Sequence, residues 1–313
     1  MLIDVHSHML WPSYLAGLEK MNIDPEAEDG FPTPSWTVAG HVKFMQETGI
    51  TTTILSLSSP HIHQGDDEMA CKLARQINEE TAALCRQYPD KFYYAAVLPL
   101  PDVQGSVDEI CYNYDQLGAI AVKAASNNHG VYLGNPSLEP VFAELNRRKA
   151  VLIIHPAKPQ AVPANVFTAG PIPLYEFIGD TTRTVIDLLA NGTLEKYPQV
   201  KIVVPHCGSF LPFVLHRLEG IGKILVAKKK MKPIHIKESM KNLYFDVAGM
   251  ALPVALPALL KITTPDHILY GSDYPYTPAP MIQQLLKDLK NYPPIQPYLQ
   301  DILANNAKKL FKL

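Results

Sequence analysis

Five polar residues in this sequence have side chains that bind divalent cations or move protons, and each stands at the end of a short apolar run. His6 and His8 follow Leu-Ile-Asp-Val, and His155 follows Val-Leu-Ile-Ile. His206 follows Ile-Val-Val-Pro, and Asp273 follows Ile-Leu-Tyr-Gly-Ser. Neutral imidazole and carboxylate are natural ligands of zinc and related ions. These residue types therefore indicate a metal site if the fold brings them together.

The pair His6 and His8 is the clearest part of this pattern. Alternate residues of a strand point to the same face, so both imidazoles can reach one point. Burying such groups without partners would cost free energy, and a divalent cation removes that cost. One histidine at a strand end is more often a packing or rim residue. Five residues at equivalent positions favour a joint site.

The elements that must position these residues can be read from the apolar pattern. Eight short runs rich in Val, Ile and Tyr are nearly continuous in apolar character, which is typical of parallel strands covered on both faces. Segments with helical spacing alternate with them. The predicted strands are 2–6, 52–57, 92–98, 119–124, 151–155, 201–206, 243–247 and 268–273. The predicted helices are 68–88, 107–117, 138–148, 181–197, 212–224, 254–262, 281–289 and 300–310.

This alternation predicts an α/β fold, a (β/α)8 TIM barrel that spans 1–313 as a single domain. An open doubly wound sheet is the alternative, although no G-x-G-x-x-G follows a strand, which disfavours its dinucleotide-binding form. In a barrel the carboxyl ends of the strands meet at the face that carries active sites. Long loops at 10–37 and 156–180 follow the first and fifth strands, and we expect them to act as functional lids.

Composition narrows the class of partner. The 28 basic and 30 acidic residues nearly cancel, so we expect no nucleic-acid partner, and the lysine run at 228–232 is interpreted as a solvated surface. The four cysteines form no C-x-x-C pair, which favours a reducing compartment. No signal peptide is visible, and the longest apolar stretch, 247–260, is shorter than the roughly 20 residues that span a bilayer. We therefore expect a cytoplasmic protein without a membrane partner.

The motifs together resemble the amidohydrolase superfamily. They are His6-Ser-His8, His155, His206-Cys-Gly-Ser with Arg217 downstream, and Gly271-Ser-Asp273-Tyr-Pro. Within the superfamily they are similar to the branch that contains aminocarboxymuconate-semialdehyde, resorcylate and 6-methylsalicylate decarboxylases. The stretch 180–206 is also similar to that branch, and the resemblance covers nearly the whole chain.

The resemblance implies one catalytic Zn²⁺ or Mn²⁺ ion bound by His6, His8, His155 and Asp273. It also implies that His206 is the acid–base group and that Arg217 contacts a substrate carboxylate, in some members from a neighbouring subunit. A homodimer is expected from the resemblance alone. The sequence departs from the family at Cys207 and Ser209, where Gly-Gly is usual after the histidine, so the shape of the pocket there is expected to differ.

The predicted function is nonoxidative decarboxylation of a small aromatic or unsaturated carboxylic acid such as a hydroxybenzoate. His206 and Asp273 are the predicted catalytic residues, and Arg217 and Trp11 are predicted to bind the substrate, with plain packing as the alternative for Trp11. A divalent ion and His206 could equally activate water, so hydrolysis of a lactone, amide or ester is the alternative reaction. A noncatalytic metal-binding protein is the alternative of another class.

Several further residues keep two interpretations. Lys123 could bridge two metals in carboxylated form, but an ordinary buried or rim lysine is favoured. Asp246 could orient a ligand or cap a loop, and Asp4 is interpreted as structural. His61 and His63 form a second H-x-H in a loop, where they could contact substrate or belong to a lid.

Overall fold

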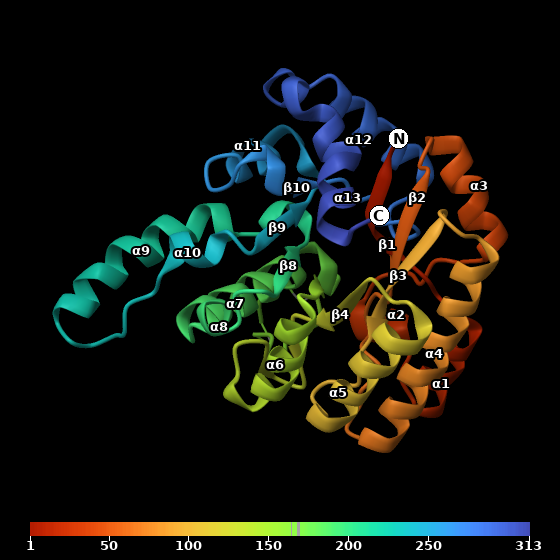
Figure 1. Ribbon diagram of the computed structural model, residues 1–313, viewed down its shortest axis with the longest axis horizontal. Helices are drawn as coiled ribbons and strands as arrows, with labels where there is room; N and C mark the ends of the chain where they lie inside the picture. Colours follow the sequence, from red (N-terminus) through yellow and green to blue (C-terminus); the bar gives the residue numbers. More distant parts are fainter. Residues whose placement is uncertain (164, 168–169) are drawn as a thin grey trace.

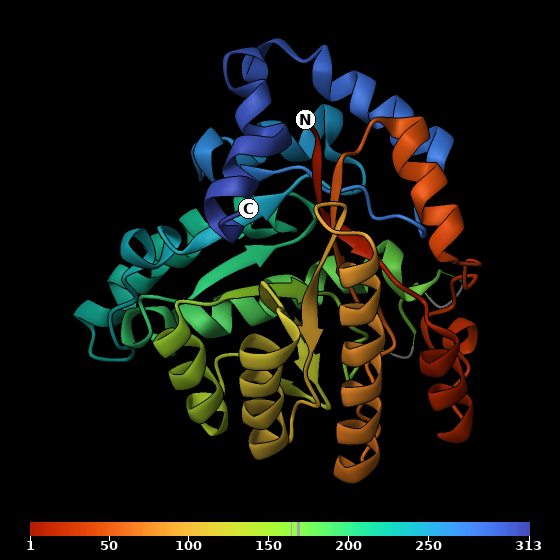
Figure 2. The same cartoon turned by 45° about the vertical axis from the view of Figure 1, so that its right-hand side comes forward.

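Eight parallel strands form a nearly closed barrel in the computed structural model of the chain, which describes residues 1–163, 165–167 and 170–313 (Figures 1 and 2). Neighbouring strands pair in the order of the chain, as a (β/α)8 barrel requires. The strands are β1 (Ile3–His8), β2 (Thr52–Ser56), β3 (Phe92–Val97), β4 (Ala121–Ala125), β7 (Val151–His155), β8 (Lys201–Val204), β9 (Leu243–Asp246) and β10 (Ile268–Leu269). The predicted fold class is confirmed.

The barrel closes where the chain that follows β10 meets β1. The backbone N–H of Val5 donates to the carbonyl of Tyr270 at 3.0 Å, and a parallel bridge joins Ser7 to Tyr274. The buried side chain of Asp4 fastens this seam. It accepts hydrogen bonds from the backbone N–H groups of His6 (3.1 Å) and Ser272 (3.0 Å) and from the Ser272 hydroxyl (2.5 Å). Asp4 is therefore structural, as the sequence suggested.

A separate apolar cluster fills the inside of the barrel and is covered by the end of the chain. Alternate strand residues point inward, as the pleat dictates. Ala304, Ala307 and Phe311, from η8 (Asp301–Asn305) and α13 (Asn306–Phe311), pack against this cluster. The cluster comprises Ile3, Val5, Ile54, Ala95, Ala121, Val151, Ile153, Val203 and Leu269. The end opposite the predicted site is thus sealed.

Helices surround the strands, with α4, α5 and α6 side by side outside them and α9 with α10 projecting away (Figures 1 and 2). The surrounding helices are α3 (Val38–Thr48), α4 (Asp67–Gln87), α5 (Val103–Tyr112), α6 (Glu139–Arg148), α7 (Glu176–Ala190), α8 (Thr193–Lys196), α9 (Leu211–Ala227), α10 (Ile236–Met240), α11 (Leu256–Leu259) and α12 (Ala279–Lys290). None of the helices in the described part of the chain has the length and apolar character that crossing a bilayer requires.

The structure departs from the sequence prediction mainly in the two long loops. The predicted loop 10–37 contains two helices, α1 (Pro12–Lys20) and α2 (Pro25–Asp29). Both begin with proline, which suits the first turn of a helix as well as a loop. The helix predicted from 181 begins at Glu176, inside the predicted loop 156–180. Positions 164, 168 and 169 of that loop lie outside the described residues.

The hydrogen bonds that Asp4 accepts at the barrel seam should stabilise the fold. Replacing Asp4 by alanine leaves two buried backbone N–H groups without this acceptor, so the free energy of unfolding is expected to fall by about 2–4 kcal/mol. Asp4→Asn keeps an acceptor oxygen for these groups. Burial already raises the pKa of Asp4 to about 7, so a neutral side chain at this position should lower the free energy of unfolding by less than about 1 kcal/mol. Urea unfolding at pH 7 measures both variants. Equal losses of unfolding free energy in the two variants would contradict this role of Asp4.

Candidate metal centre and active site

Three predicted ligands meet at the mouth of the barrel. His6 and His8 lie on β1, and His155 ends β7. The ring centroids are 4.9 Å apart for His6 and His8 and 4.7 Å apart for His8 and His155. One ring nitrogen from each histidine lies within 4.8 Å of the other two, and all three side chains are buried. The fold therefore brings these residues to one point.

Asp273 completes this group from the turn after β10. Its backbone has a φ of +62°, which turns the side chain back toward β1. One carboxylate oxygen lies 3.2 Å from Nε2 of His8 and 3.5 Å from Nε2 of His6. The predicted strand 268–273 ends at Leu269, so Asp273 follows the strand instead of ending it. Three imidazoles and one carboxylate thus share a single space.

Oxygen acceptors hold each imidazole by its other nitrogen. The Nδ1–H of His6 donates to Asp246 at 2.8 Å, and that of His155 donates to the carbonyl of Pro156 at 2.8 Å. Nδ1 of His8 lies 3.3 Å from the carbonyl of Ser56. With Nδ1 protonated, Nε2 carries the lone pair that a metal needs. Nε2 of His6 is buried and has no hydrogen-bond partner among the described residues.

Asp246, on β9, answers the question that the sequence left open. One of its oxygens accepts from the His6 ring, which orients that imidazole. The other accepts from the backbone N–H groups of His206 (3.0 Å) and Ala248 (3.1 Å). Asp246 therefore both orients a candidate ligand and organises the adjoining loops.

The electrostatics of this group fit a cation. Burial lowers the pKa of His8 and of His155 well enough to keep both rings neutral at pH 7. Burial would also lower the pKa of His6, but the charges of Asp246 and Asp273 outweigh it and raise that pKa to about 10. Burial raises the pKa of Asp273, yet the neighbouring imidazoles of His206, His6 and His8 carry it well below its usual range. A divalent cation can take the place of the His6 proton.

His206 lies beside this group but on the pocket side. It belongs to a single turn, η4 (His206–Gly208), because β8 ends two residues earlier, at Val204, and not at 206 as predicted. Its ring is 5.0 Å from that of His6, and its Nε2 is 3.9 Å from Asp273. The side chain is 20% exposed, so it can meet a bound molecule and exchange protons with it.

The segment after His206, where this sequence departs from Gly-Gly, has an unusual backbone conformation. His206, Cys207 and Ser209 all have positive φ, between 53° and 57°, a region that glycine adopts more readily. Cys207 is buried and lines the pocket, and burial raises the pKa of its thiol. Cys207 is therefore a lining group and not an activated nucleophile.

A pocket of about 630 Å³ opens above the histidines and Asp273. Its walls are largely apolar and aromatic, which suits a flat ring. The lining includes Phe31, Ser58, Ser59, His155, Phe177, His206, Phe210, Phe213, Met250, Asp273 and Tyr276. The aromatic members could not be predicted from the sequence. They are isolated residues in loops and at helix starts, and the direction of their side chains depends on the folded path of the chain.

The two predicted substrate-binding residues lie away from this pocket. Trp11 donates from Nε1 to Thr81 of α4 at 2.9 Å and stands edge-on to Trp36 at 5.0 Å. Its place supports packing, so its role as a substrate wall gains no support. Arg217 is exposed on α9 and lines a separate shallow groove. Contact between Arg217 and substrate within one chain gains no support either.

Lys123, His61 and His63 also lie outside this pocket. Lys123 is fully buried on β4 and donates to the carbonyl of Ser58 at 3.3 Å, and burial lowers its pKa to about 7. His61 and His63 line a second, polar cavity beside the first. His63 lies 2.7 Å from Asp67, at the start of α4.

The chain belongs to the amidohydrolase family, whose pattern matches residues 3–313. It is 31% identical over 313 residues to 6-methylsalicylic acid decarboxylase of Penicillium expansum, covering 99% of this chain and 95% of that protein. A solved structure described as an amidohydrolase II superposes with a TM-score of 0.93 at 37% identity, covering both chains fully. The manganese-bound structure of 5-carboxyvanillate decarboxylase from Novosphingobium aromaticivorans has a TM-score of 0.88 at 24% identity, covering 100% and 96%, and shows the same fold. These findings confirm the predicted family and branch.

The raised pKa of His6 predicts how metal binding depends on pH. Below its pKa of about 10 the ring is protonated, so a cation must displace one proton. The affinity for Mn²⁺ should therefore rise about tenfold for each pH unit between about pH 7 and pH 9, measured by competition with a chelating dye. A flat profile over that range would contradict the assignment.

Asp246→Asn is the matched variant for that experiment. Loss of its charge lowers the pKa of His6, so the pH profile should flatten, and loss of the orienting acceptor should weaken binding about 10- to 100-fold. Asp266→Asn changes an exposed acid of the same type and should leave both the pH profile and the metal affinity unchanged.

Proposed function

We propose that this chain is a metal-dependent nonoxidative decarboxylase of a hydroxybenzoate-type acid. One observation carries the proposal: His206 lies beside the cluster of His6, His8, His155 and Asp273, 5.0 Å from the His6 ring and 3.9 Å from Asp273, and it lines a pocket that suits an aromatic ring. The 6-methylsalicylic acid decarboxylase relative supports the same reaction class. We assign His6, His8, His155 and Asp273 as the metal ligands and His206 as the acid–base residue.

We further propose that the metal is a single Mn²⁺ ion. The donor set of three nitrogens and one oxygen suits zinc or manganese. The manganese in the related 5-carboxyvanillate decarboxylase structure favours the second. When bound, the ion would chelate the carboxylate and the neighbouring hydroxyl of the substrate and polarise both.

The residues of the chain then have separate tasks. The aromatic and apolar walls hold the ring. His206 supplies the proton that adds to the ring carbon bearing the carboxylate. The bond from that carbon to the carboxylate then breaks, its electron pair restores the aromatic ring, and carbon dioxide leaves. Asp273, whose carboxylate lies 3.9 Å from Nε2 of His206, is the second proposed catalytic residue.

We also propose that the chain works as a homodimer in which Arg217 reaches the substrate of the partner. Within the described residues, no lysine or arginine lines the pocket, although the substrate is an anion. The mouth of the pocket carries large apolar side chains that are more than half exposed, among them Phe213 (63%) and Met250 (64%). A partner that covered this mouth would bury them and could bring a cation.

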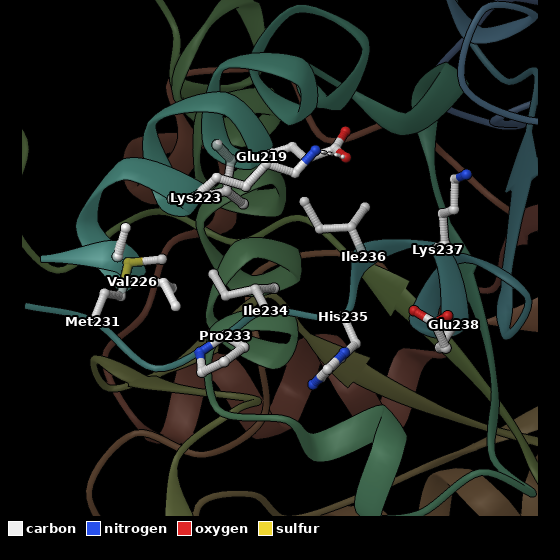
Figure 3. A pocket seen from close by; sticks show the side chains of 13 residues that line it. Glu219, Lys223, Val226, Met231, Pro233, Ile234, His235, Ile236, Lys237 and Glu238 are labelled. Carbon is white, nitrogen blue, oxygen red and sulfur yellow. Dashed lines mark hydrogen bonds and ion pairs between the residues drawn. The ribbon is translucent and has the colours of Figure 1, made fainter. Parts of the chain in front are cut away.

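The helix α9 has surfaces that support such an interface. A groove of about 410 Å³ lies along one side of it, between Lys223 and Ile234 and Ile236 (Figure 3). A shallower groove that includes Arg217 and Ile221 lies along another side. Ile224, which follows Lys223, is 56% exposed. An apolar helix face that projects from the barrel is a typical site of self-association.

Two further features are proposed with the function. We propose that 1–313 form one domain, supported by the barrel and its seal at the C-terminal helix. We propose a cytoplasmic location, supported by four cysteines that are all free thiols.

Carbon dioxide release tests the proposed reaction. Manganese-loaded protein should release carbon dioxide from at least one hydroxybenzoate in a panel that includes 6-methylsalicylate. His206→Asn should lower kcat about 10²- to 10⁴-fold while retaining manganese, because only the proton donor is lost. Asp266→Asn should keep full activity. Turnover of a lactone panel without any carbon dioxide release would sink the proposal and favour hydrolysis.

Mixing two impaired variants tests the role of Arg217 across the dimer. Arg217→Ala should raise KM about 10- to 100-fold, since a charged hydrogen bond to the substrate is lost. When Arg217→Ala and His206→Asn chains are refolded together, one site of each mixed dimer has both residues intact, so activity should return. Failure to recover activity in proven mixed dimers would place Arg217 outside the partner's site.

A further inference from the structure

Asp29 stands in the wall between two cavities. It ends the short helix α2, and its side chain lines both the pocket above the metal ligands and the polar cavity of about 310 Å³ beside it. Ser59, after β2, lines both cavities as well. Asp29 is 7% exposed, so its carboxylate is screened from bulk water but borders the substrate space.

The hydrogen bonding of this carboxylate is incomplete. The Ser59 hydroxyl donates to it. The oxygen Oδ1 is buried and has no hydrogen-bond partner within the described residues. A carboxylate offers about four acceptor sites, and leaving one unused in a buried place is costly. Burial raises the pKa of Asp29 to about 6, so the group is ionised above neutral pH and seeks a donor.

The neighbours of Asp29 do not supply that donor. Tyr276, after β10, directs its hydroxyl to the carbonyl of Ser59 at 3.4 Å. Tyr14, on α1, donates to the carbonyl of Pro60 at 2.7 Å. Lys158, after β7, lies 3.3 Å from Glu28, the acid that precedes Asp29. Each of these three side chains is thus engaged with another acceptor, and the pocket itself is a place from which a donor for Oδ1 can arrive.

The position of Tyr276 shows which part of the pocket lies next to Asp29. Its ring is 5.7 Å from the ring of His8 and 6.4 Å from that of Phe31. It therefore joins the metal end of the pocket to the wall formed by the segment after β1, to which Asp29 belongs. A ring held at the metal end would present one of its edges toward this wall.

We propose that Asp29 is a specificity-determining residue that accepts a hydrogen bond from a hydroxyl or amino group on the substrate ring. This group is additional to the hydroxyl and carboxylate that face the metal, so the inference rests on the proposed decarboxylase function. Ring substituents without a donor, such as methoxy, leave the carboxylate unpaired. A second carboxylate on the same edge meets a like charge and is disfavoured.

Matched substrate pairs test this directly. Salicylates that carry a hydroxyl at ring position 3, 4 or 5 are compared with the methoxy analogues at the same position, and kcat/KM is measured for each. In the unaltered protein at least one hydroxyl should be favoured about 10- to 100-fold over its methoxy partner, the range expected for a hydrogen bond to a charged group. Asp29→Ala should reduce that ratio to near one.

Two further variants control for structure. Asp29→Asn keeps the size and one acceptor oxygen, so its ratio should fall between those of the unaltered protein and Asp29→Ala. Glu28→Gln changes the neighbouring acid, which pairs with Lys158, and should leave the ratio unchanged. Thermal unfolding of all three shows whether α2 stays in place. A ratio near one at every position in the unaltered protein, or one that survives Asp29→Ala, overturns the inference.

Binding separates this inference from the proposed reaction. The dissociation constants of resorcinol, catechol and hydroquinone are compared with those of their monomethoxy analogues by calorimetry. If no substrate releases carbon dioxide but Asp29→Ala still abolishes a preference for the diphenols, the reaction proposal fails and Asp29 remains a selector of ligands. If carbon dioxide is released without any Asp29-dependent preference in rate or binding, the inference about Asp29 fails alone.

Discussion

Several side chains with unprotonated nitrogen or oxygen atoms meet at the mouth of this barrel, and much of the surrounding structure holds them there. His8 and His155 are neutral because they are buried, and Asp273 is ionised because three imidazoles surround it. His6 carries a proton, because the charges of Asp246 and Asp273 raise its pKa to about 10. A divalent cation satisfies all four residues at once, which no rearrangement of protons does. The need for a cation therefore explains why so many polar side chains share a buried space.

That constraint bears on the register of the barrel strands. The proposed ligands come from β1, from the end of β7 and from the turn after β10, so each strand must hold its register to keep the group together. A shift of one residue would turn His6 and His8 to the opposite face. Asp4 pins the seam between β1 and the turn at Ser272, one residue before Asp273. The structural acid at the seam and the metal group thus depend on the same few residues.

Much of this fold was predictable, and the reasons are physical. All eight strands and most helices have the apolar periodicity that burial demands, as α4 shows with Leu73 and Ile77 on its buried face. The meeting of His6, His8, His155 and Asp273 followed from one rule, that parallel strands in a barrel end at one face. The sequence could not show that His206 and Asp273 follow their strands, because positive φ at these positions leaves no compositional mark.

The pocket was harder to predict than the metal group. The direction of Trp11 depends on where α1 begins, and the helix turns that side chain toward Thr81 and away from the pocket. Asp29, Phe31 and Tyr276 lie in segments outside the repeating strand–helix pattern, so no periodicity marks them as neighbours. Arg217 lies exposed on α9, and its groove is separate from the pocket. Ligands on strands are therefore predictable, whereas pocket walls built from loops need the structure.

Anomalous diffraction at the manganese edge, from crystals grown with Mn²⁺, tests the central claim most directly. The account predicts one anomalous peak per chain, at roughly 2.0–2.2 Å from a nitrogen of each of His6, His8 and His155 and from an oxygen of Asp273. A peak bound elsewhere would contradict it. So would a peak whose coordination leaves out His155, or a pair of ions bridged through Lys123.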